Sequence, residues 1–218
     1  MNLREFTKHF GQICAVSSPA LSLEPGKLYA VIGANGSGKS TFSRVVSGVL
    51  PADQGQPVVP PSLSVGYLPQ KSYGYHMTVR KNLLLVRNDT QRASRLMKAM
   101  QLTHLAGKPA HRLSGGETAR MALARLMMKD YDLVILDEPT ASMDMESTIL
   151  SEQSIRQYLY ETGCALLLVT HSLQQARRLA DYALFFCKGS LLESGPAEHL
   201  LYHPIHKETK NFLAFYGT

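Results

Sequence analysis

The sequence predicts an α/β fold in which a doubly wound, mainly parallel sheet is covered by helices on both faces. A short apolar run at residues 28–32 precedes a glycine-rich segment and then a stretch with apolar residues at helical spacing. Two more runs of consecutive apolar residues, 133–136 and 165–169, are typical of buried parallel strands. Because segments with helical periodicity separate and follow these runs, strands and helices alternate along the chain, as this fold class requires.

The expected helices follow the strands in order. The first begins directly after the glycine-rich segment, where Phe42 and Val45 share one helical face. A tail at residues 196–215 contains two short helical patterns interrupted by His203-Pro204, because proline cannot continue a helix. In the alternating core, the segments with helical periodicity are residues 39–50, 145–161 and 173–180.

A small helical subdomain is expected within the α/β core. Strand signals vanish between residues 70 and 113, and short helices are expected at residues 79–87 and 91–100. We place the subdomain at about residues 71–130. Upstream of it, residues 55–61 contain three prolines and form a stiff connector that cannot be helical.

Length and composition indicate one folded domain over residues 1–218. Apolar residues make up 44% and charged residues 18%, which excludes wholesale disorder. No apolar run approaches the ~20 residues of a membrane-spanning helix, and residues 1–10 lack the apolar stretch of a secretory signal. The chain is therefore expected in the cytoplasm.

Cysteines and charge limit the classes of ligand. The 3 cysteines are an odd number without CxxC spacing, which argues against a disulfide framework and against a zinc site. The net charge of +6 fits an anionic ligand, an acidic membrane surface or a nucleic acid. No block of like charges forms a nucleic-acid stripe, so nucleic acid is not expected as a partner.

The glycine-rich segment, residues 33–40, is a candidate phosphate site. Its sequence Gly-Ala-Asn-Gly-Ser-Gly-Lys-Ser fits G-x-x-x-x-G-K-[ST] and lies between a predicted strand and a predicted helix. Glycines let backbone amides turn inward around an anion, and the helix N-terminus adds partial positive charge. In this pattern Lys39 reaches the terminal phosphates and Ser40 binds Mg²⁺. A flexible glycine turn is the alternative, and the strand and helix on either side argue against it.

Two carboxylates, Asp137 and Glu138, follow the buried strand at residues 133–136. Ligand crevices of open α/β sheets form at the carboxyl ends of strands. Since consecutive strand residues point to opposite faces, Asp137 can face a metal at the phosphate loop while Glu138 holds the attacking water. Without a phosphate loop, an exposed acidic turn before Pro139 would be the better interpretation.

Leu113-Ser-Gly-Gly-Glu117 precedes another apolar-periodic segment. Ser114 and Glu117 match the S-x-x-E capping box, so a helix begins here. Gly115 and Gly116 leave its first amides accessible, which makes a second candidate anion site. A plain helix cap explains the serine and the glutamate but not the adjacent glycines.

His171 directly follows the third apolar run, 165–170. Parallel strands would bring it to the same sheet edge as Glu138. A lone histidine is more often a structural or surface residue, and only this location singles it out among the 8 histidines.

Together these motifs resemble the nucleotide-binding subunit of ATP-binding cassette (ABC) transporters, of the stand-alone bacterial importer type. The resemblance covers nearly the whole chain. It implies a P-loop NTPase core, with a RecA-like mixed and parallel sheet, an amino-terminal antiparallel β part and an inserted helical subdomain. The motifs that carry it, in the family's order, are residues 33–41, Gln70 in Tyr-Leu-Pro-Gln, residues 113–117, Asp137-Glu138, Ala141-Ser-Met-Asp144 and His171.

The resemblance implies a role for each matching residue, with ATP and Mg²⁺ as the ligands. Catalysis falls to Glu138, His171 and Gln70, and Mg²⁺ to Ser40, Gln70 and Asp137. ATP is held by Phe10, Gly33, Asn35, Gly36, Ser37, Gly38, Lys39, Ser40 and Thr41, and from the opposite subunit by Ser114, Gly115, Gly116 and Asp144. Phe10 is the aromatic residue expected to stack on adenine, although phenylalanine also often packs in a core. The sequence departs from the family at Glu117, where Gln is more usual, and at Met143, where Leu is commoner.

The implied function is ATP hydrolysis in a sandwich of two cassettes, which drives solute transport through separate permease subunits. The resemblance to importers implies that transport is inward. The expected partners are a second copy of the chain, the permease and an extracytoplasmic solute-binding protein, at the cytoplasmic face of the cell membrane. Tyr73, Tyr75 and Met77 either fill the permease groove or pack locally. The tail and the compact helical segment resemble cassettes for amino acids or for oxyanions such as phosphate or tungstate.

Two other functions stay open at this point. One is a soluble ABC-type ATPase acting on nucleic acid or ribosomes, whose usual coiled coil or zinc module is missing between Lys39 and Asp137. The other is a small P-loop kinase or GTPase, which would not need residues 113–117 and would carry an N-K-x-D motif if it bound guanine nucleotides.

Overall fold

A computed structural model describes residues 1–216 and contains a mixed sheet of eight strands. A separate antiparallel pair is formed by β1 (Asn2–Leu3) and β4 (Leu21–Ser22). In spatial order the large sheet consists of β2 (Phe6–Phe10), β3 (Ile13–Ser18), β10 (Ser190–Pro196), β9 (Tyr182–Cys187), β5 (Leu28–Ile32), β8 (Ala165–Val169), β7 (Leu133–Asp137) and β6 (Val65–Leu68).

The strand directions confirm the expected fold class. The neighbours β9, β5, β8, β7 and β6 are all parallel, whereas β2 pairs with β3 and β9 pairs with β10 in antiparallel fashion. The sheet therefore combines a parallel core with an antiparallel part to which the amino-terminal strands belong. The expected strands at residues 28–32 and 165–169 have those bounds, and the one expected at 133–136 extends by one residue to Asp137.

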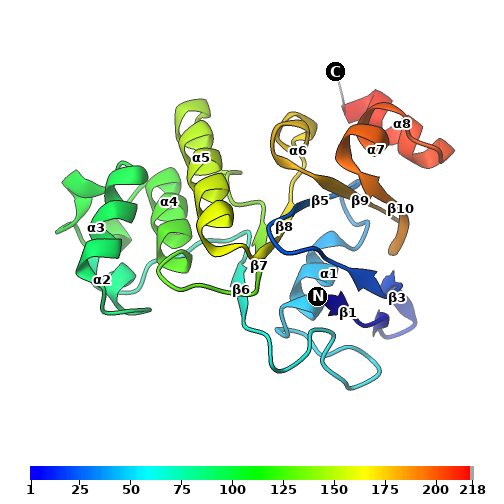
Figure 1. Cartoon of the computed structure of the whole chain (residues 1–218), viewed down its shortest axis with the longest axis horizontal. Helices are drawn as coiled ribbons and strands as arrows, with labels where there is room; N and C mark the ends of the chain where they lie inside the picture. Colours follow the sequence, from blue (N-terminus) through cyan, green and yellow to red (C-terminus); the bar gives the residue numbers. More distant parts are fainter. Residues whose placement is uncertain (217–218) are drawn as a thin grey trace.

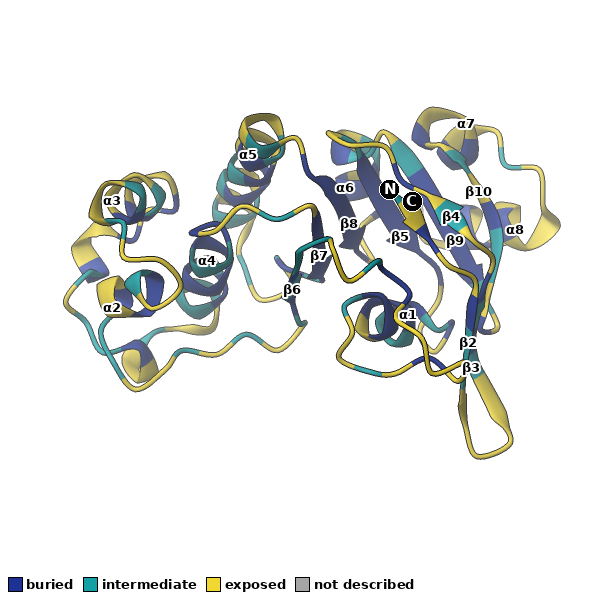
Figure 2. Ribbon diagram, turned by 60° about the horizontal axis from the view of Figure 1, so that its bottom comes forward, coloured by how far each residue is buried: buried dark blue, intermediate teal, exposed yellow. Residues whose placement is uncertain are grey.

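Helices cover both faces of the parallel core. On one face lies α1 (Lys39–Val46), and on the other lie α4 (Gly115–Leu126), α5 (Met145–Thr162), α6 (Leu173–Leu179), α7 (Ala197–Tyr202) and α8 (Lys207–Tyr216). Figure 2 shows the buried strands between these layers. Because successive side chains of a strand point to opposite faces of the sheet, β7 contributes to the core on both faces. Leu133 and Ile135 pack with α1, whereas Val134 and Leu136 pack with α4 and α5.

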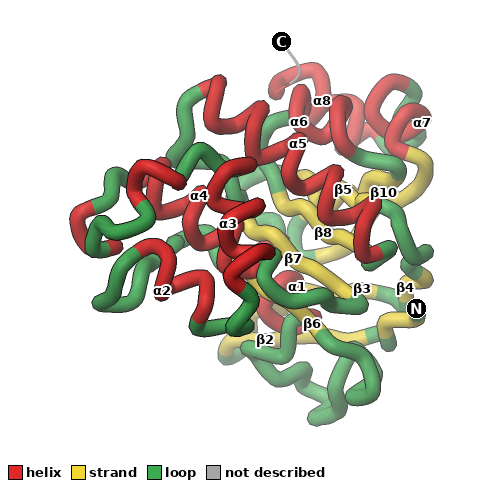
Figure 3. Tube along the Cα trace, turned by 60° about the vertical axis from the view of Figure 1, so that its left-hand side comes forward, coloured by secondary structure: helices red, strands yellow, loops and turns green. Residues whose placement is uncertain are grey.

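The segment between β6 and β7 is helical, as expected. It contains α2 (Val79–Leu84), α3 (Thr90–Ala99), two short 3-10 helices (Thr103–Leu105 and Ala110–Arg112) and α4. Figures 1 and 3 place α2, α3 and α4 together at one end of the molecule. Within residues 1–216, the only β pairing in this segment is an isolated bridge between Thr78 and Pro109.

Helix bounds differ from the expected ones at several ends. The helix expected over residues 39–50 ends at Val46, because Ser47 is its C-cap and Gly48 adopts a φ of 77°, a left-handed conformation that ends helices. The helix expected over 79–87 ends at Leu84, and the other expected helices agree to within one residue at each end. The tail forms α7 and α8 on either side of His203-Pro204, as predicted.

A search of the described residues, 1–216, finds no helix with the length and hydrophobicity of a membrane span.

Candidate active site

The predicted site residues converge because their strands are neighbours. β5, β8, β7 and β6 are adjacent and parallel, so the segments that follow them lie at one edge of the sheet. Those segments carry the glycine-rich loop, His171, the Asp137-Glu138 pair and Gln70. They border a cleft of about 530 Å³ lined by Ile13, Cys14, Ala15, Asn35, Gly36, Ser37, Gly38, Lys39, Ser40, Thr41, Gln70, Glu138, His171, Lys188 and Gly189.

The loop at residues 33–38 requires glycine for both its conformation and its packing. Gly33 has a φ of 146°, and a Cβ there would lie 2.2 Å from the Phe186 carbonyl oxygen. Gly38 has a φ of 103°, and a Cβ there would lie 2.6 Å from the Ala15 carbonyl oxygen. Gly38 is also the N-cap of α1 and supplies no side-chain acceptor to the first amides of the helix. Those amides suit a phosphate group.

Lys39 is held inside the loop. Only 5% of its surface is exposed, and its Nζ donates to the carbonyl oxygens of Gly33 at 2.7 Å and Ala34 at 2.8 Å. Burial lowers the pKa of Lys39, while the nearby carboxylates of Glu138 and Asp137 oppose this shift. The loop therefore carries a buried cation next to the two acidic residues.

Asp137 has one carboxylate oxygen available for a cation. Its side chain is buried, Tyr67 donates to its Oδ2 at 3.4 Å, and within the described chain its buried Oδ1 has no hydrogen-bond partner. Burial and the charge of Glu138 raise the pKa of Asp137, against the effect of the Ser40 hydroxyl and of Arg44. An unpartnered carboxylate oxygen beside a hydroxyl is the hard oxygen set that Mg²⁺ prefers.

Glu138 joins the other two predicted catalytic residues. Gln70 Nε2 donates to its Oε2 at 3.3 Å, and His171 Nε2 contacts its Oε1. The backbone of Glu138 has a φ of 50°, which is unusual for a residue with a side chain and often occurs at functional sites. The structure thus brings together Gln70, Glu138 and His171, which are far apart in the sequence.

The segment at residues 113–117 forms the predicted capping box but lies elsewhere. Ser114 caps α4, with its Oγ accepting from the Glu117 amide at 3.2 Å and its own amide donating to the Glu117 carboxylate at 2.8 Å. The Ser142 hydroxyl donates to the Gly115 carbonyl at 3.5 Å, and Asp144 caps α5. Among residues 1–216, neither this turn nor Asp144 lines the 530 Å³ cleft.

Phe10 lies at the end of β2, beside the cleft rather than in its lining. It is 53% exposed and pairs with Ile13 across the hairpin of β2 and β3. Cross-strand partners share one face of a hairpin, so Phe10 lies next to Ile13, which does line the cleft. Its role in stacking on adenine stays a prediction.

Sequence reasoning missed the other wall of the cleft. Ile13, Cys14 and Ala15 come from β3, and Lys188 and Gly189 form the turn between β9 and β10, where the Gly189 amide donates to the Ser37 carbonyl at 3.1 Å. The Lys-Gly pair is a hairpin-turn signal, since both residues have positive φ. Nothing local to the sequence shows that this turn meets the phosphate loop.

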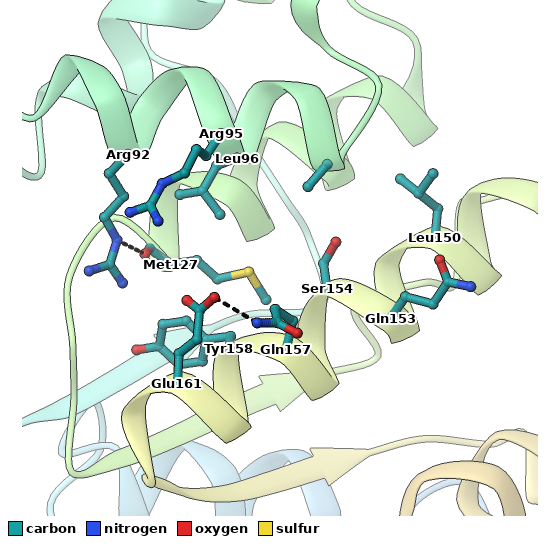
Figure 4. Close-up of a pocket in the computed structure, with 11 residues that line it drawn as sticks. Arg92, Arg95, Leu96, Met127, Leu150, Gln153, Ser154, Gln157, Tyr158 and Glu161 are labelled. Atoms are coloured by element: carbon teal, nitrogen blue, oxygen red, sulfur yellow. Dashed lines mark hydrogen bonds between the residues drawn. The ribbon is translucent and has the colours of Figure 1, made fainter.

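A second cleft, of about 360 Å³, lies between α3 and α5 (Figure 4). Its floor includes Met127 and Tyr158, and several of its polar groups already have partners. Arg92 donates from Nε to the Met127 carbonyl at 2.8 Å, and Gln157 donates to Glu161 at 2.7 Å. Its lining includes none of the predicted site residues, whereas Lys39, Gln70, Glu138 and His171 all line the first cleft, which is therefore the candidate active site. Asp137 is buried directly before Glu138 and is not itself a lining residue.

Comparisons with known proteins agree with these observations. The family model described as "ABC transporter" matches residues 16–141. Zinc import ATP-binding proteins named ZnuC, from Yersinia pseudotuberculosis serotype I (strain IP32953) and Yersinia pestis bv. Antiqua (strain Antiqua), are each 34% identical over the whole chain and 85% of their own length.

Solved structures share the fold. One is an ATP-binding subunit of an ABC transporter, with a TM-score of 0.82, 17% identity and coverage of 100% of this chain and 99% of that one. Another is the ADP conformation of an ATP-binding cassette of an ABC transporter, with a TM-score of 0.76, 21% identity and coverage of 98% and 99%. The chain belongs to the ABC transporter family and is an ATP-binding subunit with ATPase activity.

Proposed function

We propose that two copies of the chain close over ATP and use its hydrolysis to drive import through separate permease subunits. The observation that carries this proposal is the separation of the two candidate anion sites. The cleft holds the glycine-rich loop and the Gln70, Glu138 and His171 side chains, whereas the turn at residues 114–116 lies outside it in the same chain. A second copy could supply that turn, so that ATP is bound between copies.

Each side chain in the cleft has a distinct proposed task. The loop amides and Lys39 bind the phosphates, Glu138 accepts a proton from the attacking water, and His171 orients the Glu138 carboxylate and contacts the γ-phosphate. Gln70 follows β6 and donates to Glu138, so a change in the position of Gln70 would be passed on to the helical segment that follows it. Ser114, Gly115, Gly116 and Asp144 act from the opposite copy.

The donor set fits Mg²⁺. The unpartnered Oδ1 of Asp137, the Ser40 hydroxyl and the Gln70 side chain are the residues proposed to hold it. When bound, Mg²⁺ neutralises negative charge on the nucleotide phosphates. This proposed role of Asp137 is supported by its position on the sheet face of Leu133 and Ile135, which pack with α1 just beyond the phosphate loop.

The proposed permease contact lies on the helical segment at about residues 71–130, which we treat as a subdomain. A groove of about 160 Å³ there is lined by residues that include Tyr73, Tyr75, Val86 and Arg125. The Arg125 guanidinium lies 5.1 Å from the Tyr73 ring centre and 4.8 Å from the Tyr75 ring centre. These partly exposed aromatic residues suit a short helix from the permease, and docking there would hold the chain at the cytoplasmic face of the membrane.

Zinc is the cargo suggested by the relatives' names, rather than the amino acids or oxyanions suggested by the tail. We propose zinc import with a permease and an extracytoplasmic solute-binding protein as partners. Cargo selection rests with those chains. Zinc uptake into vesicles that contain the co-purified permease tests this, because ATP-dependent uptake of another solute but not zinc would reject it.

The ATPase assignment is tested by Glu138→Gln. Removing a positioned general base costs about 10²–10⁴-fold, so turnover should fall at least ~100-fold while ATP binding persists. Lys39→Ala is the complementary variant, which should lose ATP affinity in a direct titration. Steady-state hydrolysis at the normal rate in Glu138→Gln would remove Glu138 from the role of base.

A further inference from the structure

A buried polar network lies directly behind the candidate active site. Gln175 is 2% exposed and Glu152 is 6% exposed, although both side chains are polar. They come from α6 and α5, which lie on the same face of the sheet (Figure 1). Buried polar groups are costly unless they are hydrogen-bonded, so the partners of these two side chains show what they hold in place.

The Gln175 amide joins two segments. Its Nε2 donates to Glu152 Oε1 at 3.1 Å and to the Thr140 hydroxyl oxygen, also at 3.1 Å. Glu152 accepts two further bonds from Arg178, from Nε at 3.0 Å and from Nη2 at 2.6 Å. The link between α5 and α6 is therefore already made by Glu152 and Arg178, and the bond from Gln175 to Thr140 is an additional connection.

That additional connection reaches the loop that carries Glu138. Thr140 is two residues after Glu138, and the Ala141 amide donates back to the Glu138 carbonyl at 3.3 Å, which makes the turn compact. On the other side, Gln175 is in the first turn of α6, and its backbone N–H donates to the Ser172 hydroxyl oxygen at 3.1 Å. Ser172 directly follows His171.

The contact between Glu138 and His171 thus spans two loops, and its His171 side is weakly packed. The His171 side chain is 41% exposed, compared with 13% for Glu138. Packing alone leaves the imidazole free to turn away from the carboxylate. The hydrogen bond from Gln175, in the first turn of α6, to Thr140, in the loop after Glu138, restricts the relative movement of the two segments.

We propose that Gln175 is a positioning residue for ATP hydrolysis. By bonding to Thr140 and Glu152 together, it fixes the helix after His171 relative to the loop after Glu138, and so keeps the imidazole in contact with the carboxylate. This inference rests on the proposed roles of Glu138 and His171. It predicts a loss in turnover rather than in ATP binding, because Gln175 does not line the cleft.

Two variants remove the connection from opposite ends. Thr140→Val deletes the acceptor with little change in shape, and Gln175→Leu deletes the amide. Both should lower kcat at least ~10-fold and leave KM for ATP within about twofold, since a small misplacement of catalytic groups is costly. Gln174→Leu, an exposed neighbour on the same helix, is the matched control and should keep the normal kcat.

A charge exchange separates positioning from general packing. Gln175→Glu places a second carboxylate beside Glu152 and should lower kcat as Gln175→Leu does, because like charges repel. Adding Glu152→Gln restores one amide, now at position 152, and one carboxylate, now at position 175. The Thr140 hydroxyl then donates to the carboxylate at position 175 instead of accepting from an amide. The double variant should recover to within ~3-fold of the normal kcat, a coupling that a thermodynamic cycle quantifies.

The outcomes are distinct. Normal kcat in both Thr140→Val and Gln175→Leu, whatever their melting temperatures, would overturn the positioning role and leave the network as a contact between helices. Equal losses in single and double charge variants would overturn it as well. Normal turnover in Glu138→Gln, measured in parallel, would instead reject the proposed function on which this inference rests.

Discussion

The His171 imidazole contacts the Glu138 carboxylate through Nε2 and Oε1. The two residues follow β8 and β7, which are adjacent parallel strands paired from Leu133 with Ala165 to Asp137 with Val169. Their contact is therefore a consequence of strand order. Gln70, which follows β6 on the other side of β7, donates to the same carboxylate. A carboxylate held by a histidine and an amide is the arrangement expected if Glu138 is the general base that we propose.

Gly33 should tolerate no side chain. A Cβ at this position would lie 2.2 Å from the Phe186 carbonyl oxygen, which is backbone and cannot move aside. Gly33→Ala should thus reduce ATP affinity at least ~10-fold by displacing the loop. Gly26→Ala, outside the loop and the cleft, is the matched control, because its Cβ would meet open space and only the φ of 72° is unfavourable. Fluorescent ATP titrations of both variants test the difference, and equal affinities would contradict it.

Tyr67→Phe should weaken the response to Mg²⁺. The variant loses the hydroxyl that donates to Asp137 Oδ2 at 3.4 Å. The pKa of Asp137 is already raised, mainly by burial, so losing a donor further favours the protonated form and protons compete with the metal. The Mg²⁺ concentration for half-maximal ATPase activity should rise ~2- to ~10-fold, with Tyr160→Phe on the exposed face of α5 as control. An unchanged Mg²⁺ dependence would place the metal elsewhere.

Ser114 combines a structural cap with a proposed contact to the ATP of the partner copy, and two variants separate these roles. Ser114→Ala should lower the free energy of unfolding by about 1 kcal/mol through loss of the cap. Ser114→Asp keeps a capping acceptor but directs negative charge toward the phosphates, so it should retain stability and lose most ATPase activity. Full activity in a stable Ser114→Asp variant would show that this turn meets no phosphate.

Glu193 should make the docking of the tail sensitive to acid. Burial raises its pKa, but donors from the Ile205 amide at 2.8 Å, the Thr209 hydroxyl at 2.5 Å and the His206 amide at 3.2 Å outweigh burial and lower the pKa below its ordinary value of 4.5. Because the folded pKa is depressed, the stabilisation is complete above pH 4.5 and is lost as the pH falls through the folded pKa.

Glu193→Gln removes this titration and should cost about 1–3 kcal/mol of unfolding free energy at neutral pH, because an amide nitrogen would face buried donors. The difference from the unsubstituted protein should shrink below pH 4.5. Urea denaturation at pH 7 and pH 4 measures it. A difference that is the same at both pH values would show that the carboxylate charge is not what stabilises the tail.

The parallel core could be predicted because its strands are fully buried. β5, β7 and β8 are unbroken apolar runs, which are easy to recognise in the sequence. β6 has alternating burial and only four residues, and β10 contains the glycine and glutamate that weaken a strand signal. Their partners in the sheet, rather than their own composition, determine these strands, so no individual strand could be assigned there from the sequence.

The parts of the site that could be predicted are those formed by residues consecutive in the sequence. Residues 33–40 and the Asp137-Glu138 pair each form a pattern that is recognisable from consecutive residues, and residues 35–40 and Glu138 line the cleft. Lys188 carries no such pattern, because the turn reaches the phosphate loop only through the pairing of β9 with β5 and β10. The bond between Gln175 and Thr140 likewise depends on how α6 packs, which no local spacing encodes.

The central claim is that ATP is bound between two copies of the chain, and the mass of Glu138→Gln with and without Mg²⁺ and ATP tests it most directly. Light scattering on a sizing column should show the 24.1 kDa monomer without nucleotide and a species of twice that mass once ATP is bound but not hydrolysed. A variant that binds ATP with normal affinity yet stays monomeric at every protein concentration would contradict the account.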